Sequence, residues 1–200
     1  KLAAFGFLGL GALFGLGLVL TSSWWLLLIG AAAILAAWGY TGGSNPYGYR
    51  ALGEVSVFLF FGLVAVLGTT YVQLGTVNLP AIAGSIGIGA LACVILVANN
   101  LRDRAKDEVV GKKTLAVVLG DKKSRIFFAS LNALAIATLL VLIPTTWWAL
   151  LGLAALPWIA RSTRAVLGGA EGPALIAVLG DTGRAELFYA LGLTIGLFIA

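Results

Sequence analysis

Histidine is absent from this chain of 200 residues, and cysteine occurs once, at Cys93. Without histidine there is no imidazole metal ligand, no histidine general base and no Ser-His-Asp triad. One cysteine excludes a disulfide within the chain, and its place in an apolar run is typical of a small buried residue. Any chemistry here depends on the other polar side chains.

Charge is also scarce. The chain has 13 Lys and Arg, 8 Asp and Glu, and 60% hydrophobic residues. A soluble domain of this length needs far more charged groups on its surface. Apolar stretches near 20 residues recur instead, long enough to cross a hydrocarbon core of about 30 Å. They are continuous rather than alternating, which favours helices over a barrel. We therefore expect an all-α, polytopic transmembrane helix bundle.

Seven spans are expected, and the sixth contains Pro157, which predicts a kink or a tilt. Short uncharged connections alternate along the chain with longer charged ones. The expected spans are residues 2–20, 24–40, 52–72, 79–98, 125–143, 147–160 and 185–200.

Alternation of these spans places all 13 Lys and Arg on one side of the membrane. The positive-inside rule makes that side cytoplasmic. Four tryptophans stand at the opposite, uncharged ends of the spans and predict an interfacial aromatic belt. They are Trp24, Trp25, Trp147 and Trp148.

The segment 99–107 carries the clearest chemical signal. On a helix, Asn99, Asp103 and Asp107 share one face, each one turn from the next. Carboxylate and amide oxygens suit hard cations, and Mg²⁺ takes one or two carboxylates together with substrate phosphate oxygens. The alternative is a solvated loop in which the two aspartates pair with neighbouring basic residues. Those neighbours are Arg102, Arg104 and Lys106.

Basic residues crowd the same segment and its continuation. Arg suits bidentate phosphate contacts, and Lys supplies a compact point charge. Gly111-Lys112-Lys113-Thr114 is similar to the end of a nucleotide-binding P-loop, but the earlier glycine and the preceding strand are missing, so a P-loop is excluded. A cation site and an anion site side by side indicate a diphosphate ligand.

The segment 40–50 is rich in glycine and carries Tyr40, Tyr47, Tyr49 and Arg50. Glycines let backbone N–H groups approach a ligand, and tyrosine rings can face an aromatic molecule or a cation. The alternative is a plain Gly/Asn/Pro turn between two spans. Glu54 follows one helical turn after Arg50, a spacing that allows an ion pair.

These motifs resemble a known family. Asn99-Asn100-Leu101-Arg102-Asp103-x-x-x-Asp107, with 111–117 after it, is similar to the second aspartate-rich motif of the UbiA superfamily of intramembrane prenyltransferases. The segments 40–54 and 61–73 are similar to the branch that prenylates 1,4-dihydroxy-2-naphthoate in menaquinone synthesis. The specific similarity extends over about residues 40–118.

The resemblance implies an enzyme of a bacterial cell membrane with its site facing the cytoplasm. A polyprenyl diphosphate would be the donor and 1,4-dihydroxy-2-naphthoate the acceptor, with loss of diphosphate and CO₂ to give demethylmenaquinone. Asp103 and Asp107 would hold Mg²⁺ with Asn99, while Arg102, Lys106 and Lys112 stabilise charge on the diphosphate. The acceptor would meet Tyr40, Tyr47, Tyr49 and Arg50.

The chain departs from the family pattern in one respect. Family members have nine helices and an earlier Asn-Asp-x-x-Asp motif, which this sequence lacks. We expect residues 1–200 to form a single transmembrane domain that lacks its first two helices. Two alternatives stay open: another acceptor, such as 4-hydroxybenzoate, a porphyrin or a phosphoribosyl sugar, and a non-enzymatic lipid-binding or transport protein.

Overall fold

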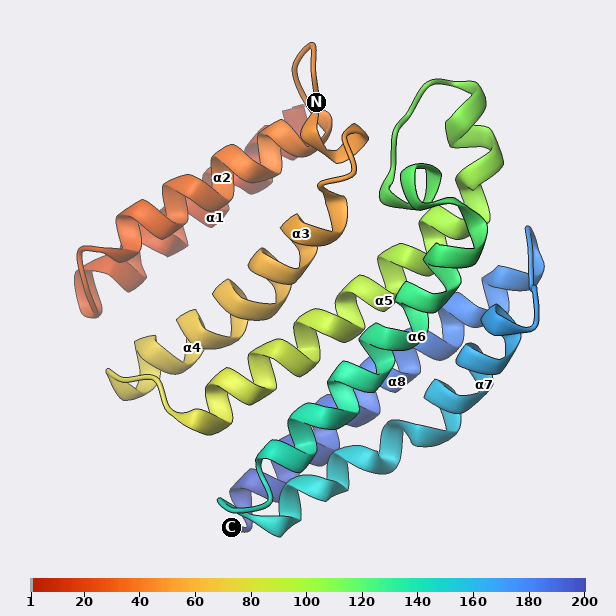
Figure 1. Ribbon diagram of the computed structural model, residues 1–200. Helices are drawn as coiled ribbons and strands as arrows, with labels where there is room; N and C mark the ends of the chain where they lie inside the picture. The colour runs from red at the N-terminus through yellow and green to blue at the C-terminus, as the bar shows by residue number, and fades with distance from the viewer. Residues whose placement is uncertain (1) are drawn as a thin grey trace.

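A computed structural model describes residues 2–200, and this part of the chain is built from helices (Figure 1). The helices form seven rods, which confirms the expected all-α bundle. Five rods are single helices: α1, α2, α5, α6 and α8. Their bounds are Leu2–Thr21, Leu26–Thr41, Leu79–Val109, Leu115–Val141 and Ala174–Phe198.

Two rods change helix type along their length. The third rod joins α3 (Gly53–Val57), the π-helical segment η2 (Phe58–Val64) and α4 (Ala65–Leu74). The sixth joins the 3₁₀ segment η3 (Trp147–Ala155) to α7 (Leu156–Leu167). The change from η3 to α7 falls at Pro157, in the first turn of α7, where the missing N–H has no helical partner to lose.

Four predicted span limits were wrong, each at the charged end of a helix. The sixth rod, for example, ends with α7 at Leu167 rather than at residue 160. Helix α5 ends at Val109 rather than at residue 98. Helix α6 begins at Leu115 rather than at residue 125, with a break at Gly120, and α8 begins at Ala174 rather than at residue 185. Hydropathy marks where an apolar layer ends, but backbone hydrogen bonding continues beyond it. Asp103 and Asp107 consequently lie on a helix.

Helix α5 is the centre of the bundle, in contact with the third rod, α6 and α8. Its residues Ala90, Leu91 and Val94 are completely buried. Small residues allow these close approaches: a Cβ on Gly62 of η2 would lie 2.5 Å from the Cα of Gly89 of α5. Side-chain packing rather than water exclusion holds such helices together in a membrane.

Helices α1 and α2 form a hairpin to one side of the third rod (Figure 1). Val19 is the only buried residue of α1. At the start of α2, the ring of Trp25 meets that of Tyr71 on α4 edge-on, with centroids 4.9 Å apart. At the other end, α2 contacts the short 3₁₀ segment η1 (Tyr47–Tyr49).

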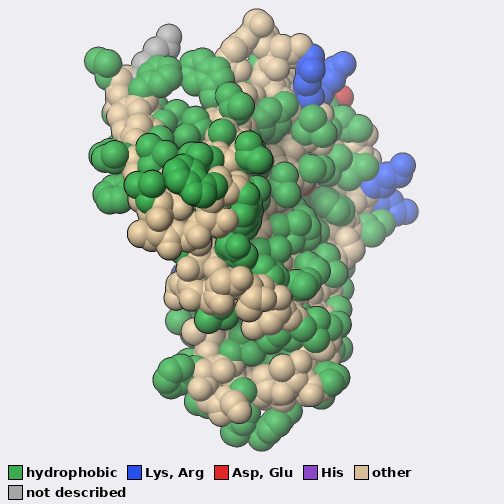
Figure 2. Space-filling view, turned by 90° about the vertical axis from the view of Figure 1, so that its left-hand side faces the viewer, with side chains coloured by type: hydrophobic (Ala, Val, Ile, Leu, Met, Phe, Trp, Pro, Cys, Tyr) green, Lys and Arg blue, Asp and Glu red, His purple; other side chains and the backbone are tan. Residues whose placement is uncertain are grey.

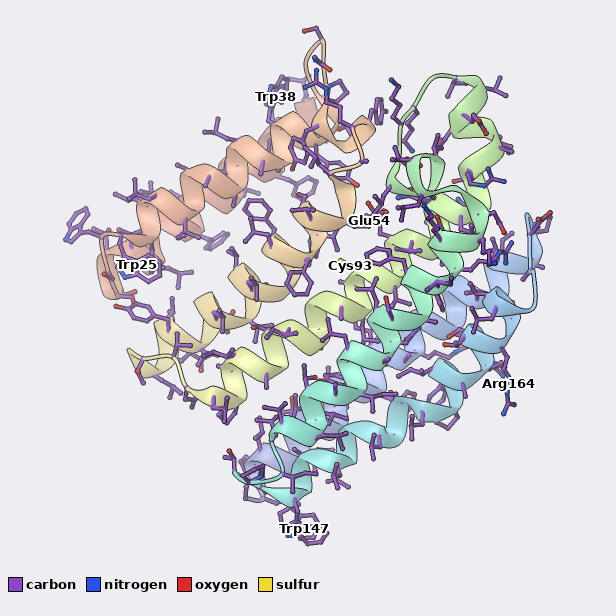
Figure 3. All side chains as sticks on the ribbon, viewed as in Figure 1. Trp25, Trp38, Glu54, Cys93, Trp147 and Arg164 are labelled. Atoms are coloured by element: carbon purple, nitrogen blue, oxygen red, sulfur yellow. The ribbon has the colours of Figure 1, made fainter. Side chains whose placement is uncertain are left out.

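The surface fits a membrane protein. Four helical segments of residues 2–200 are long and apolar enough to cross a bilayer. On the face in Figure 2, the clearly visible Lys and Arg side chains lie in the upper part of the view, and hydrophobic side chains are spread over the whole face. Trp25 and Trp147 lie at the opposite end from the charged loops (Figure 3), as the aromatic-belt prediction requires. The fold thus gathers the polar chemistry at one end of the bundle.

The Gly62–Gly89 crossing gives a stability prediction. Gly62→Ala should destabilise the protein by about 1–3 kcal/mol, because the added methyl group overpacks the contact between η2 and α5. Gly68→Ala, on the same rod, is the matched control: nothing lies within 4 Å of its added Cβ. Thermal unfolding in detergent should show a lower midpoint for Gly62→Ala alone. Equal midpoints for the two variants would contradict this packing.

Candidate active site at the charged end of helix α5

Helix α5 ends in a turn that folds its last residues back on themselves. The N–H of Lys112 donates to the carbonyl of Asp107 at 2.8 Å, and the N–H of Gly111 to that of Glu108 at 3.2 Å. This pair of bonds is a Schellman motif, which requires a left-handed residue just past the helix. Gly111 supplies it, with φ +74°. The turn brings Lys112 back beside the aspartates.

Both aspartates carry a cationic partner. The guanidinium of Arg102 grips Asp103 through two hydrogen bonds, of 2.9 and 2.6 Å. Asp107 is 7% exposed, and the Nζ of Lys112 lies 3.2 Å from its Oδ2. The structure therefore bears out pairing of Asp103 with Arg102, but the partner of Asp107 is Lys112, from beyond the helix, rather than a neighbour on α5. Lys106 is exposed and makes no ion pair with residues 2–200.

The turn that follows α5, residues 110–113 (the lysine turn), is hydrogen-bonded to the end of the tyrosine-containing segment, residues 40–50, and to Ala51 just after it. The N–H of Ala51 donates to the carbonyl of Lys113 at 2.7 Å, and the N–H of Lys113 donates to the carbonyl of Tyr49 at 3.2 Å. The Nζ of Lys112 also lies 5.5 Å from the centre of the Tyr49 ring, within the range of a cation–π interaction. The two segments that the sequence singled out thus meet at one place.

The tyrosines take different positions there. The ring of Tyr40 meets that of Tyr47 edge-on, with centroids 5.5 Å apart. The hydroxyl of Tyr47 donates to the carbonyl of Ala36 at 2.7 Å and lies 3.0 Å from the Oγ of Ser56. Tyr47 therefore ties α2 to α3, whereas Tyr49 and Arg50 are exposed beside the lysine turn.

Two cavities flank the third rod near this end. One, of about 600 Å³, lies between α2 and the third rod and is lined by Tyr40 and Tyr47. The other, of about 380 Å³, lies between the third rod, α5 and α8 and contains Asn99 and Glu186. Phe61, on η2, lines both. Single π-helical turns are frequent at functional sites, and this one sets an aromatic ring between two cavities.

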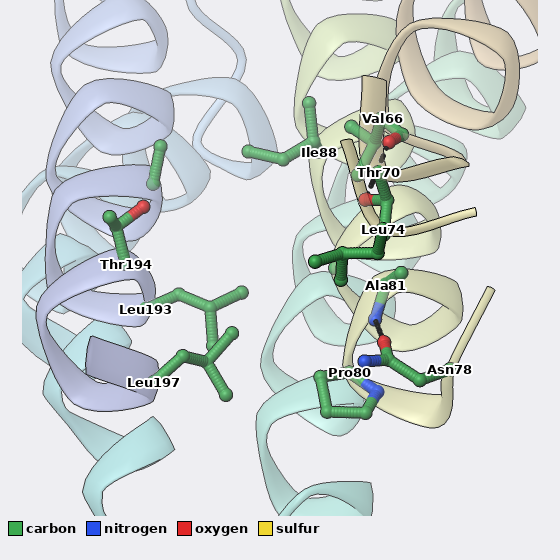
Figure 4. A pocket seen from close by; sticks show the side chains of 12 residues that line it. Val66, Thr70, Leu74, Asn78, Pro80, Ala81, Ile88, Leu193, Thr194 and Leu197 are labelled. Atoms are coloured by element: carbon green, nitrogen blue, oxygen red, sulfur yellow. Dashed lines mark hydrogen bonds between the residues drawn. The ribbon is translucent and has the colours of Figure 1, made fainter. Parts of the chain in front are cut away.

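A further cavity, of about 470 Å³, lies at the other end of α5, between α4, α5 and α8 (Figure 4). Gly84 and Ile88 line this cavity, and Ala92, Ile95 and Asn99 line the cavity of about 380 Å³. These positions follow helical spacing, so the two cavities lie along one face of α5. From Asn78, where α5 begins, to Asn99 this face is about 30 Å long at the rise of an α-helix.

The oxygen donors allow a test of the expected metal. No three His, Cys, Asp or Glu side chains within residues 2–200 come close enough together to hold an ion by themselves. Two carboxylates and one amide follow each other along α5, which fits Mg²⁺ bound with part of its shell supplied by phosphate oxygens and water. Asn99, Asp103 and Asp107 thus suit a cation that binds together with a diphosphate.

Comparison with known proteins identifies the family of this chain. The profile of the UbiA prenyltransferase family matches residues 1–175. The chain belongs to this family. No solved structure matches the chain.

Several curated relatives of this UbiA-family chain are named 1,4-dihydroxy-2-naphthoate octaprenyltransferase. The protein of that name from Mycobacterium tuberculosis is 49% identical over 94% of this chain and 65% of its own length. That from Mycobacterium leprae is 46% identical over 93% of this chain and 63% of its own length. The Escherichia coli protein of that name is 36% identical over 87% of this chain and 58% of its own length. The chain thus spans somewhat less than two thirds of these relatives.

One buried acidic residue of this UbiA-family chain had no clear role in the sequence. Glu54, 4% exposed, makes no ion pair with Arg50 within the described residues. Its Oε1 accepts a hydrogen bond from the Nδ2 of Asn100 at 2.9 Å instead. A carboxylate one turn after an arginine signals a local pair, so only the packing of α3 against α5 reveals this contact.

The α5 turn predicts a difference between two substitutions. Gly111→Ala should destabilise the protein by about 1–2 kcal/mol, because a left-handed backbone crowds its Cβ. Gly111→Asn should be much milder, since asparagine tolerates this conformation. Midpoints of thermal unfolding compare the two, and limited proteolysis at 110–114 reports local opening. Equal behaviour of the two variants would argue against the turn.

Proposed function

We propose that this protein, as part of its full-length enzyme, transfers a polyprenyl group from an allylic diphosphate to 1,4-dihydroxy-2-naphthoate. The observation that carries the proposal is the contact between the lysine turn and the tyrosine-containing segment, through Lys113 with Tyr49 and Ala51. This contact joins a cation- and anion-binding helix end to an aromatic segment. A prenyltransferase with an aromatic acceptor needs both.

The donor diphosphate binds at the end of α5. Arg102, Lys106 and Lys112 supply positive charge, and Asp103 and Asp107, with Asn99, would hold Mg²⁺. When bound, Mg²⁺ supplies positive charge to the diphosphate oxygens. As the allylic C–O bond breaks, its electron pair leaves with the diphosphate. Arg102 and Lys112 stabilise that charge because their side chains lie beside the two aspartates that would hold the cation.

The acceptor lies on the tyrosine side of the site. Tyr40, Tyr47 and Tyr49 provide aromatic faces, and the exposed Arg50 is free to pair with the acceptor carboxylate. The ring carbon that bears the carboxylate attacks the allylic carbon to form the new C–C bond. Departure of CO₂ then returns the electron pair of the C–COO⁻ bond to the ring and restores aromaticity, with no proton lost. Phe61 lies between the two cavities, where an aromatic face can shield the allylic carbon from water.

The polyprenyl tail runs along the face of α5 shared by the two cavities. Its apolar walls come from Ile88, Ala92 and Ile95 on α5 and from Leu193 on α8. A face about 30 Å long suits a long apolar chain lying parallel to the helices. The diphosphate then stays at the charged end while the tail extends through the membrane-spanning part.

The charged end faces the cytoplasm of a bacterial cell in this proposal. Lys and Arg residues of the described part occur in the segments at this end, and the positive-inside rule assigns such an end to the cytoplasm. Both substrates then approach from the side on which soluble enzymes make diphosphates.

The proposal is tested by removing the aspartates one at a time from the full-length protein. Asp103→Asn and Asp107→Asn should each lower Mg²⁺-dependent prenyl transfer at least about 100-fold, because the charge that holds the cation is lost. Membrane insertion should be unchanged. Transfer is measured with a labelled polyprenyl diphosphate and a panel of aromatic acceptors, alongside the diphosphate released.

Glu108→Gln is the matched control. Glu108 is the neighbouring acidic residue on α5, its side chain is 66% exposed, and it lies 3.8 Å from Arg104 only. Its loss should leave turnover near the wild-type value. Wild-type turnover in Asp103→Asn or Asp107→Asn would exclude that residue from the site, and transfer to an acceptor other than the naphthoate would change the assigned substrate.

A further inference from the structure

Glu54 and Asn100 form a buried contact between α3 and α5. Besides the 2.9 Å hydrogen bond between their side chains, the thiol of Cys93 donates to the main-chain carbonyl of Glu54 at 3.1 Å. Glu54 is 4% exposed and Asn100 5% exposed. Figure 3 shows Glu54 and Cys93 where α3 and α5 face each other. These two hydrogen bonds join the third rod to α5 close to the aspartates.

The surroundings make this contact costly to lose. The cavity beside Glu54 has apolar walls, including Phe58, Phe127 and Leu131. The Oε2 of Glu54 has no hydrogen-bond partner among residues 2–200, so Asn100 is the sole side-chain donor to this carboxyl group. A buried polar group that loses its last partner keeps the full cost of desolvation. The contact therefore resists rotation or sliding of α5 relative to α3.

Helical geometry connects the contact to the site. Successive residues of an α-helix point about 100° apart, so Asn99 points about 100° around the axis of α5 from Asn100, which points toward Glu54. Asn99 lines the cavity next to α8. Asp103 lies one turn further, about 40° from Asn99 around the axis. Holding Asn100 against Glu54 thus fixes the direction in which Asn99 and Asp103 point.

We propose that Glu54 is a positioning residue: its hydrogen bond to Asn100 sets the rotation of α5 about its axis and so aims Asn99 and Asp103 at the donor diphosphate. This rests on the function proposed above. Glu54 touches neither the diphosphate nor its cation. Its substitution consequently affects binding of the diphosphate donor more than binding of the aromatic acceptor.

Single substitutions at Glu54 and Asn100, and a double variant that exchanges their carboxyl and amide groups, test the proposal in the full-length enzyme. Asn100→Asp places two carboxyl groups against each other, and Glu54→Ala removes the acceptor. Each should raise the KM for the polyprenyl diphosphate at least about tenfold, with little change in the KM for the acceptor. The double variant Glu54→Gln with Asn100→Asp restores an N–H to oxygen bond in the opposite sense. It should return the donor KM to within about threefold of the wild-type value.

Cys93 provides a second readout that does not depend on activity. Its side chain is buried between the same two helices. Asn100→Asp should increase the rate at which N-ethylmaleimide labels the Cys93 peptide, followed by mass spectrometry, and the exchanged pair should restore protection. If the proposed reaction is wrong, the wild-type protein shows no prenyl transfer, yet the labelling result still reports on the contact.

Tyr189→Phe is the control for general loosening of the bundle. It removes a buried hydrogen bond of 2.7 Å between Tyr189 on α8 and Thr138 on α6. It should lower the unfolding temperature while leaving the donor KM unchanged. Recovery of Cys93 protection without recovery of the donor KM in the exchanged pair would overturn the positioning role. An equal rise in donor and acceptor KM in Asn100→Asp would overturn it as well.

Discussion

Close packing around helix α5 is the constraint on which the rest of the structure depends. In lipid there is no hydrophobic driving force between apolar helices, so helices associate in a membrane where their surfaces fit closely. Gly62 and Gly89 allow the third rod to approach α5, and Gly87 leaves room on α5 for Tyr189 of α8 and Thr138 of α6. The cavity that contains Asn99 is lined by the third rod, α5 and α8, which this packing holds together.

The end of α5 turns that packing into a site. A helix must satisfy its last carbonyl groups, and here the turn at Gly111 does so while returning Lys112 to Asp107. The same few residues continue into the main-chain bonds between Lys113 and the tyrosine-containing segment. One local requirement of backbone hydrogen bonding thus brings carboxylates, cations and aromatic rings together.

The ion pairs at this end of the bundle compensate the charges of both aspartates on α5. Asp103 and Asp107 are each held by a cation, so neither carboxylate is left uncompensated near the membrane. Asp181 on α8 likewise forms ion pairs, with Arg161 and Arg184. In the proposed function, a diphosphate that binds together with a divalent ion would replace these internal ion pairs by pairs of the same kind.

The sequence by itself determined the class of protein, the number of rods and the residues of the two motifs. A long apolar run in lipid must satisfy its backbone hydrogen bonds within itself, which a helix does. Hydropathy detects such runs because it depends only on the residues of a single segment. It placed helix ends poorly, since α5 continues past the apolar layer to Val109. Family membership then followed from residues 99–107 and 40–54, because both lie in continuous stretches of chain.

Only the tertiary structure decided which side chains meet. Glu54 and Asn100 are far apart in sequence, and their contact depends on how α3 crosses α5. The spacing of Arg50 and Glu54 pointed to a local ion pair, but burial of Glu54 against α5 directs its carboxyl group elsewhere. Local spacing reports on neighbours along one helix, whereas partners across a helix crossing are set by the rotation and distance of two packed surfaces.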